Sequence, residues 1–398
     1  MTLPTTHPLL PEATEWLRQL VSFNTISRHS NLELIEAINQ HLQASLHLES
    51  QVRLNPERTK ANLLASIGPV ANDGVVLSGH TDVVDVADQD WHSDPFALKS
   101  APPYLYGRGT CDMKGFIACA LAMAPEFARA PLKKPVHLAF SRDEEIGCLG
   151  ADDMLDMLRE TGMRPAAAVV GEPTCMEIIA GHKGGIVAHT SFHGVPAHSS
   201  MPEEGISSIP FAARFVTHLS DLEQEMALQS ENTTEYQQFN VPYGTINAGV
   251  IQGGTALNIF AARCQVDWHY RSMPGANLEL FQSHLEAWLN TELEPAMQER
   301  HRQAGIENII EASYPGLTPL TLEQSPALSL AAQLTGSQNT GVLSIGTEAG
   351  FFQNGHIPAV VIGPGDLAQA HKPNEFVTQE QLCQCLHFLE RLCHSLSS

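Results

Sequence analysis

The sequence has few cationic side chains, no closely paired cysteines and no long apolar run. Its 22 lysines and arginines are outnumbered by 44 aspartates and glutamates, so the formal net charge is −22. This balance argues against nucleic acid and anionic membrane surfaces as partners, because both attract basic proteins. None of the eight cysteines forms a CxxC pair, which argues against a zinc ribbon and a disulfide framework and favours free thiols.

The absence of membrane and export signals points to a soluble protein. No run of 18 apolar residues occurs, and the first 20 residues lack a basic segment followed by an apolar one. We therefore expect a cytoplasmic protein.

The chain is long enough for two domains, because 398 residues exceed one ordinary core. Up to about residue 182 the predicted strands alternate with predicted helices, which is typical of an α/β domain with a largely parallel sheet. Residues 183–292 read as strand, helix, strand, strand, helix, which indicates a small α+β domain. We predict an α/β domain of residues 1–182 and 293–398, interrupted by an α+β domain of residues 183–292.

Acidic and histidine side chains follow the predicted core strands. They are His80 and Asp82 after "VVLSG", Asp112 before the helix "MKGFIACALA", Glu144 and Glu145 after "HLAFS", Glu172 after "AAAVVG", and His371 beyond "PAVVIG". Taken singly, each has an ordinary explanation, such as a helix cap for Asp112. Open α/β sheets bind ligands at the carboxyl ends of their strands, so the convergence of these residue types at one edge predicts a site.

Two histidines and three carboxylates match the donors of a two-metal hydrolytic centre. The ions of such centres lie about 4 Å apart, so one carboxylate must serve both. One ion would then take His80, Asp112 and Glu172, and the other Asp112, Glu145 and His371. The donor set favours two Zn²⁺ ions, with Co²⁺ or Mn²⁺ as substitutes. We expect the carboxylate of Asp82 to accept a hydrogen bond from the other ring nitrogen of His80.

Six segments resemble, in order, the di-zinc deacylases and exopeptidases, a family that includes acetylornithine deacetylase, succinyl-diaminopimelate desuccinylase, aminoacylase and glutamate carboxypeptidase. They are "SGHTDVV", "GRGTCDMKG", "SRDEEIGCLGA", "VVGEPT", "HGVPAHSS" and "AQAHKPNE". The resemblance implies a zinc-binding domain interrupted by a lid and dimerisation domain, and hence a homodimer. It also implies that the five donors are zinc ligands, that Asp82 supports His80, and that Glu144 is the general base.

The same resemblance implies roles for residues of the inserted domain. His198, in "VPAHSS", matches a histidine that helps to bind the developing oxyanion, often across the dimer. Arg271 and Asn258 match positions that contact the substrate. Neighbouring residues on a strand point to opposite faces, so we expect Glu145 to bind metal while Glu144 handles the proton.

The segments "GTEAGFFQNGHIPAVVIGPG" and "QAHKPNEFV" are similar to those of acetylornithine deacetylases. We therefore expect hydrolysis of N2-acetyl-L-ornithine in arginine biosynthesis, with Arg271 pairing the α-carboxylate. Glu348 would bind the side-chain ammonium or, equally, complement the start of a helix. In this family a glutamate at the position of Glu172 goes with deacylation and carboxypeptidase activity. The alternatives are acetylcitrulline, other N-acyl amino acids, succinyl-diaminopimelate, a carboxypeptidase, and an inactive metal-binding dimer.

Overall fold

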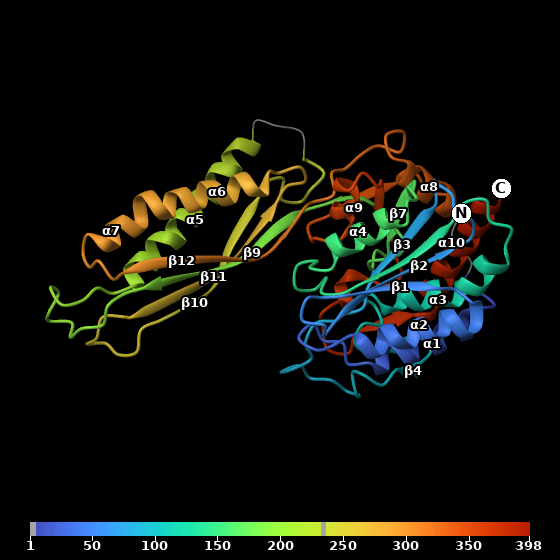
Figure 1. Cartoon of the computed structure of the whole chain (residues 1–398), viewed down its shortest axis with the longest axis horizontal. Helices are drawn as coiled ribbons and strands as arrows, with labels where there is room; N and C mark the ends of the chain where they lie inside the picture. The colour runs from blue at the N-terminus through green and yellow to red at the C-terminus, as the bar shows by residue number, and fades with distance from the viewer. Residues whose placement is uncertain (1–4, 232–235) are drawn as a thin grey trace. The chain divides into compact units, whose positions relative to one another are not determined.

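A computed structural model describes residues 5–231 and 236–398 of the chain (Figure 1). The chain forms two compact units. The first unit comprises Met1–His182, Leu317–Leu343 and Thr347–Ser398, and the second unit comprises Lys183–Gly316 and Ser344–Gly346. The fold is a mixed α/β fold with an inserted unit, as the sequence predicts. No helix within the described ranges is long and apolar enough to cross a membrane.

The first unit is built on an eight-stranded sheet. Its strands, in spatial order, are β1 (Ser50–Leu54), β2 (Ala61–Ile67), β6 (Val136–Ser141), β3 (Val75–His80), β7 (Ala167–Val170), β14 (Ala359–Val361), β8 (Ile178–His182) and β13 (Thr340–Leu343). The central strands β6, β3, β7 and β14 are parallel to their neighbours in that set. They are buried along their whole length because helices cover both faces of the sheet.

Alternate strand residues enter two different cores. Val75 and Leu77 of β3 pack into one cluster, whereas Val76 between them packs into the other. Helices of the first cluster are α1 (Leu10–Ser22), α2 (Leu32–Leu46), α3 (Lys114–Arg129), α8 (Pro326–Thr335) and α10 (Gln379–Ser397); those of the second are α4 (Ala151–Glu160) and α9 (Ala349–Asn354). The carboxyl ends of the central strands are left at one edge, where the site lies.

A small antiparallel sheet lies beside this edge. It contains β4 (Lys99–Ala101), β5 (Tyr104–Tyr106) and β15 (Phe376–Thr378), in the order β15–β5–β4. Phe376 pairs with Tyr106, and the ladder continues with a hydrogen bond of 3.0 Å from the Gly107 amide to the Glu375 carbonyl. This pairing holds the segment after β5 against the segment before β15.

The second unit is an antiparallel sheet with helices on one face. Its strands, in spatial order, are β10 (Thr245–Gly253), β11 (Arg263–Ser272), β9 (Gly184–His193) and β12 (Gly305–Tyr314). The helices are α5 (Ile209–Ser230) and α6 (Leu278–Trp288), the latter continued by a π turn, Leu289–Leu293, into α7 (Glu294–Gln298). Phe192 and Trp268 of the sheet pack against Phe215 of α5.

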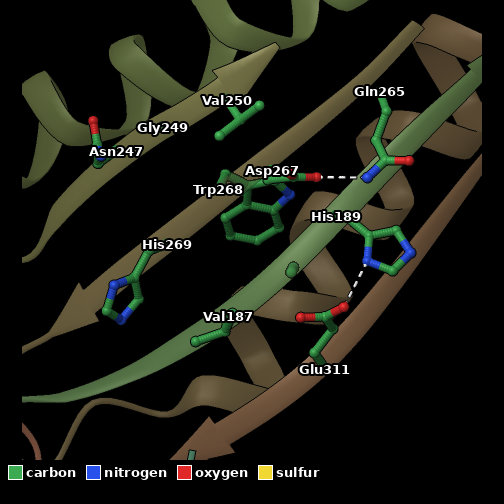
Figure 2. A pocket seen from close by; sticks show the side chains of 11 residues that line it. Val187, His189, Asn247, Gly249, Val250, Gln265, Asp267, Trp268, His269 and Glu311 are labelled. Carbon is green, nitrogen blue, oxygen red and sulfur yellow. Dashed lines mark hydrogen bonds and ion pairs between the residues drawn. The ribbon is translucent and has the colours of Figure 1, made fainter. Parts of the chain in front are cut away.

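The opposite face of this sheet is polar and slightly hollowed (Figure 2). A cavity of about 320 Å³ lies over β9, β10 and β11. His189 Nδ1 lies 3.0 Å from Glu311 Oε1, and Gln265 Nε2 donates to Asp267 Oδ1 over 2.7 Å (Figure 2). The contact of His189 with Glu311 joins β9 to β12, whereas that of Gln265 with Asp267 lies along β11, and both leave polar groups paired on the solvated face of the sheet.

The return to the first unit lies later than the sequence indicates. We predicted it at residue 293, but the second unit extends to Gly316 and also takes in Ser344–Gly346. The reason is β12, which pairs with β9 from Gly305 to Tyr314. A strand that completes a sheet with a partner far upstream carries little local signal of the domain to which it belongs.

Candidate metal centre

Two parallel strands and the turn before α3 deliver buried polar side chains to the same edge. His80 ends β3 and is 1% exposed, and Glu172 follows β7 by two residues and is also buried. Asp112 lies in the turn before α3 and is buried too. Burying such groups costs free energy unless they are paired or bind a cation.

Asp112 lies between two histidines. Its Oδ1 is 3.1 Å from His80 Nε2, and its Oδ2 is 3.3 Å from His371 Nε2. Glu172 Oε1 is 3.9 Å from His80 Nε2, and Glu145 Oε2 is 3.0 Å from His371 Nε2. The structure thus brings the five predicted donors together as two groups that share Asp112, each with donor atoms within 4.8 Å of one another.

The four carboxylates of the cluster, Asp112, Glu144, Glu145 and Glu172, outnumber its two histidines. Among the described residues, the ion pairs made by Asp112, Glu144, Glu145 and Glu172 are with histidines and not with lysine or arginine. Burial raises the pKa of Glu144 and of Glu172 well above the usual range, and Glu172 Oε1 has no hydrogen-bond partner within the described part of the chain. Hydrogen bonds to Asp112 and Glu145 raise the pKa of His371 to about 10. A site of this charge and donor set fits two divalent cations.

Asp82 supports the site differently from the prediction. His80 Nδ1 donates to the backbone carbonyl of Asp82 over 2.9 Å, whereas the Asp82 carboxylate is 3.7 Å away. The carbonyl contact still orients the ring, because it places the lone pair on Nε2, facing Asp112. The carboxylate instead accepts the backbone N–H groups of Glu144 and Glu145 over 3.1 and 3.3 Å. Asp82 therefore holds the turn that carries both glutamates.

The sequence predicts that Glu144 and Glu145 lie at the end of a strand, but they lie in a turn. The strand β6 ends at Ser141, and the Glu144 carbonyl accepts the N–H groups of Gly147 and Cys148. The two side chains nevertheless diverge. Glu145 approaches His371, while Glu144 Oε2 lies 4.0 Å from His80 Nε2.

Glu348 is enclosed within the first unit. It is 2% exposed, and its Oε2 accepts a hydrogen bond of 3.1 Å from Ser78 Oγ. It precedes α9 without a side-chain cap, and its Oε1 has no hydrogen-bond partner among residues 5–231 and 236–398. Burial raises the pKa of Glu348. Its two suggested roles stay predictions.

The predicted substrate contacts of the second unit fall at two ends of its sheet. His198 and Asn258 lie together, because the Ser199 amide donates to the Asn258 carbonyl over 2.9 Å. Arg271 lies at the other end of β11, opposite Gly185. The structure therefore joins His198 to Asn258 but does not join either to Arg271.

The local contacts of His198 define its tautomer. Its Nδ1 accepts the Ser200 amide over 3.2 Å and lies 2.7 Å from Ser200 Oγ. In the neutral ring the proton is therefore on Nε2, which makes this exposed histidine a hydrogen-bond donor.

Sequence reasoning missed two residues near the predicted ones. Lys183 begins the second unit, and burial and the charge of Arg271 lower its pKa to about 8, so two cationic side chains gather at this end of the sheet. Glu375 is a buried carboxylate whose Oε1 accepts the Asp112 amide over 3.1 Å. Its only sequence signal is its place in "AQAHKPNE", four residues after His371.

A third group of possible donors, His7, His387 and Glu390, does not fit a metal. His7 Nδ1 accepts the Leu9 amide over 3.1 Å, so the proton of the neutral ring is on Nε2. That nitrogen then has no lone pair to offer. We assign this group no ion.

Comparisons with known proteins identify the family of the chain and support its fold. The model of peptidase family M20/M25/M40 matches residues 76–395. A metallo-carboxypeptidase of the M20 family from Sulfolobus solfataricus has a similar fold, with 16% identity over 97% of this chain and 99% of that one and a TM-score of 0.75. The dipeptidase Dug1p from Saccharomyces cerevisiae shows 14% identity over 98% and 96%, with a TM-score of 0.71.

A dinuclear metal-binding peptidase of the M20 family from Bacillus subtilis is also similar, with 16% identity over 97% of each chain and a TM-score of 0.63. At these identities the solved structures support the fold, while the family model covers most of the chain. The protein therefore belongs to peptidase family M20/M25/M40 and is a metal-dependent hydrolase of that family.

Proposed function

We propose that the protein hydrolyses the amide bond of an N-acyl α-amino acid, with N2-acetyl-L-ornithine as the first candidate. The observation that carries the proposal is the placement of Asp112, whose two oxygens face two different donor groups beside Glu144. The segments similar to acetylornithine deacetylases support the substrate, and a glutamate at the position of Glu172 goes with deacylation and carboxypeptidase activity in this family. The alternative substrates are acetylcitrulline, other N-acyl amino acids, succinyl-diaminopimelate and peptides with a free carboxyl end.

The residues divide into two metal positions. His80, Asp112 and Glu172 would hold the first ion, and Asp112, Glu145 and His371 the second, with Zn²⁺ or Co²⁺ as the ion. Bound ions would supply Lewis-acid polarisation of the carbonyl and of water. The hydrogen bond from His80 Nδ1 to the Asp82 carbonyl keeps Nε2 free for this role.

Glu144 is placed to move the proton. Its carboxylate accepts a proton from water as the C–O bond forms, and returns it to the nitrogen of the departing amine. Burial raises the pKa of Glu144, which favours holding a proton between the two steps. Its backbone is fixed by the hydrogen bond to Asp82.

Two cations and one imidazole of the second unit suit the substrate. Arg271, with Lys183 close enough for their charges to repel, suits the α-carboxylate. His198 Nε2–H suits the oxyanion that develops on the carbonyl oxygen.

We propose that these groups meet one substrate in a homodimer formed through the second unit, with the partner subunit supplying His198. The second unit exposes apolar side chains of Ile251, Leu257 and Ile259, which a subunit interface would cover. Sedimentation equilibrium would give twice the chain mass, and a monomer with full activity would exclude the arrangement.

The substrate is tested by kcat/KM on four compounds: acetylornithine, acetylcitrulline, acetylmethionine and succinyl-diaminopimelate. Acetylornithine should be preferred by a factor of ten or more over acetylmethionine, because a buried or paired charge discriminates more strongly than apolar contact. A dipeptide with a free carboxyl end serves as the comparison for peptidase activity. Faster turnover of the dipeptide would overturn the acyl amino acid assignment while leaving a metal-dependent hydrolase.

A further inference from the structure

The side chain of Glu375 is completely buried and accepts four hydrogen bonds. Its Oε1 accepts the backbone amides of Cys111 and Asp112 over 2.8 and 3.1 Å. Its Oε2 accepts the amide of Gly109 over 3.1 Å and Arg108 Nη1 over 2.7 Å. An ionised carboxylate has about four lone-pair positions, so this one is fully used.

All three backbone donors belong to the loop that carries Asp112. One of them is the amide of Asp112 itself, so the position of this residue depends directly on the Glu375 carboxylate. Gly109 has a positive φ of 81°, and an added Cβ would come within 2.8 Å of Val83 Cγ1. The loop thus has an unusual backbone course, and the carboxylate holds its N–H groups on one side.

The backbone of Glu375 belongs to the segment that carries His371. Glu375 follows His371 by four residues and immediately precedes β15, where pairing with β5 fixes its backbone. The Gly107 amide donates to the Glu375 carbonyl over 3.0 Å. The carboxylate therefore links two ligand-bearing segments that are distant in sequence.

Arg108 extends the link to His371 and balances the buried charge. Its Nη1 contacts the Lys372 carbonyl over 3.3 Å, and its Nη2 donates to Gln89 Oε1 over 2.7 Å. Gln89 Nε2 in turn donates to the His371 carbonyl over 3.1 Å. The network ends on the backbone of Asp112 and of His371, two donors of the second metal position.

We propose that Glu375 is a positioning residue that sets the spacing of Asp112 and His371 and thereby the affinity of the second metal position. This inference rests on the metal-binding part of the proposed function. The rival interpretation is a buried ion pair of Glu375 with Arg108 that contributes only to stability. If Glu375 positions the ligands, its replacement should change metal affinity as well as stability. If it contributes only to stability, metal affinity should stay the same.

The variant Glu375→Gln distinguishes the two interpretations. The amide has one acceptor oxygen, and its NH₂ group would face an N–H donor where the carboxylate offers an oxygen. The loop should shift at Gly109 or at Cys111 and Asp112. Partners that orient metal ligands typically change metal affinity about 10–100-fold. The second position, which depends on both Asp112 and His371, should therefore bind Zn²⁺ about 10–100-fold more weakly, and the first position, which shares only Asp112, should change less.

The measurement is a Zn²⁺ titration of the metal-free full-length protein against a chromophoric chelator, with Tm recorded for each variant. The matched control is Asn55→Ala. Asn55 Oδ1 accepts two backbone amides, of Thr59 and Lys60, over 2.8 and 2.9 Å, and neither residue is a predicted metal ligand. The control should lower Tm and keep both equivalents at wild-type affinity. Glu375→Asp keeps the charge on a shorter side chain and should bind the weakened equivalent with intermediate affinity.

Two results would overturn the inference. One is a Glu375→Gln protein that binds both equivalents as tightly as the wild type while losing Tm as the control does. If that variant does not fold, wild-type affinity for both equivalents in Glu375→Asp is the equivalent refutation. A wild type that binds two ions but hydrolyses no acyl amino acid would refute the proposed substrate class and not this inference.

Discussion

His137 should make the first unit sensitive to acid. It lies on β6, is fully buried, and has its Nδ1 2.8 Å from Ser66 Oγ. Its Nε2 is buried, and no residue that the structure describes forms a hydrogen bond with it. Burial lowers the pKa of His137 from 6.5 to about 4. A proton on this ring would place a charge in the sheet with no acceptor for the second N–H group.

The lowered pKa of His137 determines how the free energy of unfolding changes with pH. As pH falls, the unfolded chain takes up the proton near 6.5, while the folded protein takes it up only near 4. The stability that the neutral ring permits is therefore present above pH 6.5 and is lost between pH 6.5 and 4. Each pKa unit corresponds to about 1.4 kcal/mol, so the full loss is roughly 3 kcal/mol, with about 2 kcal/mol of it reached by about pH 5.

The assay is urea unfolding at about pH 7.5 and about pH 5, with EDTA present so that metal binding does not add its own pH dependence. Between the two pH values the wild type should lose about 2 kcal/mol more than His137→Leu. The exposed residue His394 supplies the control, His394→Leu, which should follow the wild type. Equal losses in wild type and His137→Leu would refute the reasoning, because they would mean that the folded protein accommodates the charged ring.

Three further predictions concern the site. Glu144→Gln should lower kcat by about 100-fold or more while two equivalents of metal remain bound, because Glu144 is in neither donor group; near-normal kcat would reject the base assignment. Saturating Zn²⁺ should raise Tm above that of the EDTA-treated protein, since an ion at about 100 times its Kd adds about 2.7 kcal/mol per position; an unchanged Tm would argue against ions at the buried carboxylates. Glu348→Gln should reduce the preference for acetylornithine over acetylmethionine if Glu348 recognises the ammonium, and an unchanged ratio in kcat/KM would reject that role.

His80, Glu145 and Glu172 could be predicted as metal donors because each comes shortly after a strand with a strong local signature. The apolar runs that form β3, β6 and β7 are short, continuous and bounded by polar residues, so their carboxyl ends could be placed. Parallel strands then bring those ends to one edge, and the histidines and carboxylates converge as expected.

Contacts made by backbone groups could not be predicted in the same way. The Asp82 carboxylate holds the amides of Glu144 and Glu145, although its spacing from His80 suggested a contact with the imidazole. Glu375 acts on the amides of a loop more than 200 residues earlier. Every residue except proline has a backbone N–H group, so residue type and spacing do not reveal which one a buried carboxylate will accept.

The α/β pattern and a set of five candidate donors in two groups can be predicted from the sequence, because strand periodicity and donor chemistry are local properties. The folded chain adds that Asp112 turns one oxygen to each histidine, and that β12 belongs to the second unit. It also places Arg271 near the carboxyl end of β11, whereas Asn258 lies in the loop before the amino end of the same strand. These outcomes depend on pairings between distant segments, whose register is set by packing of the whole fold and not by either segment alone.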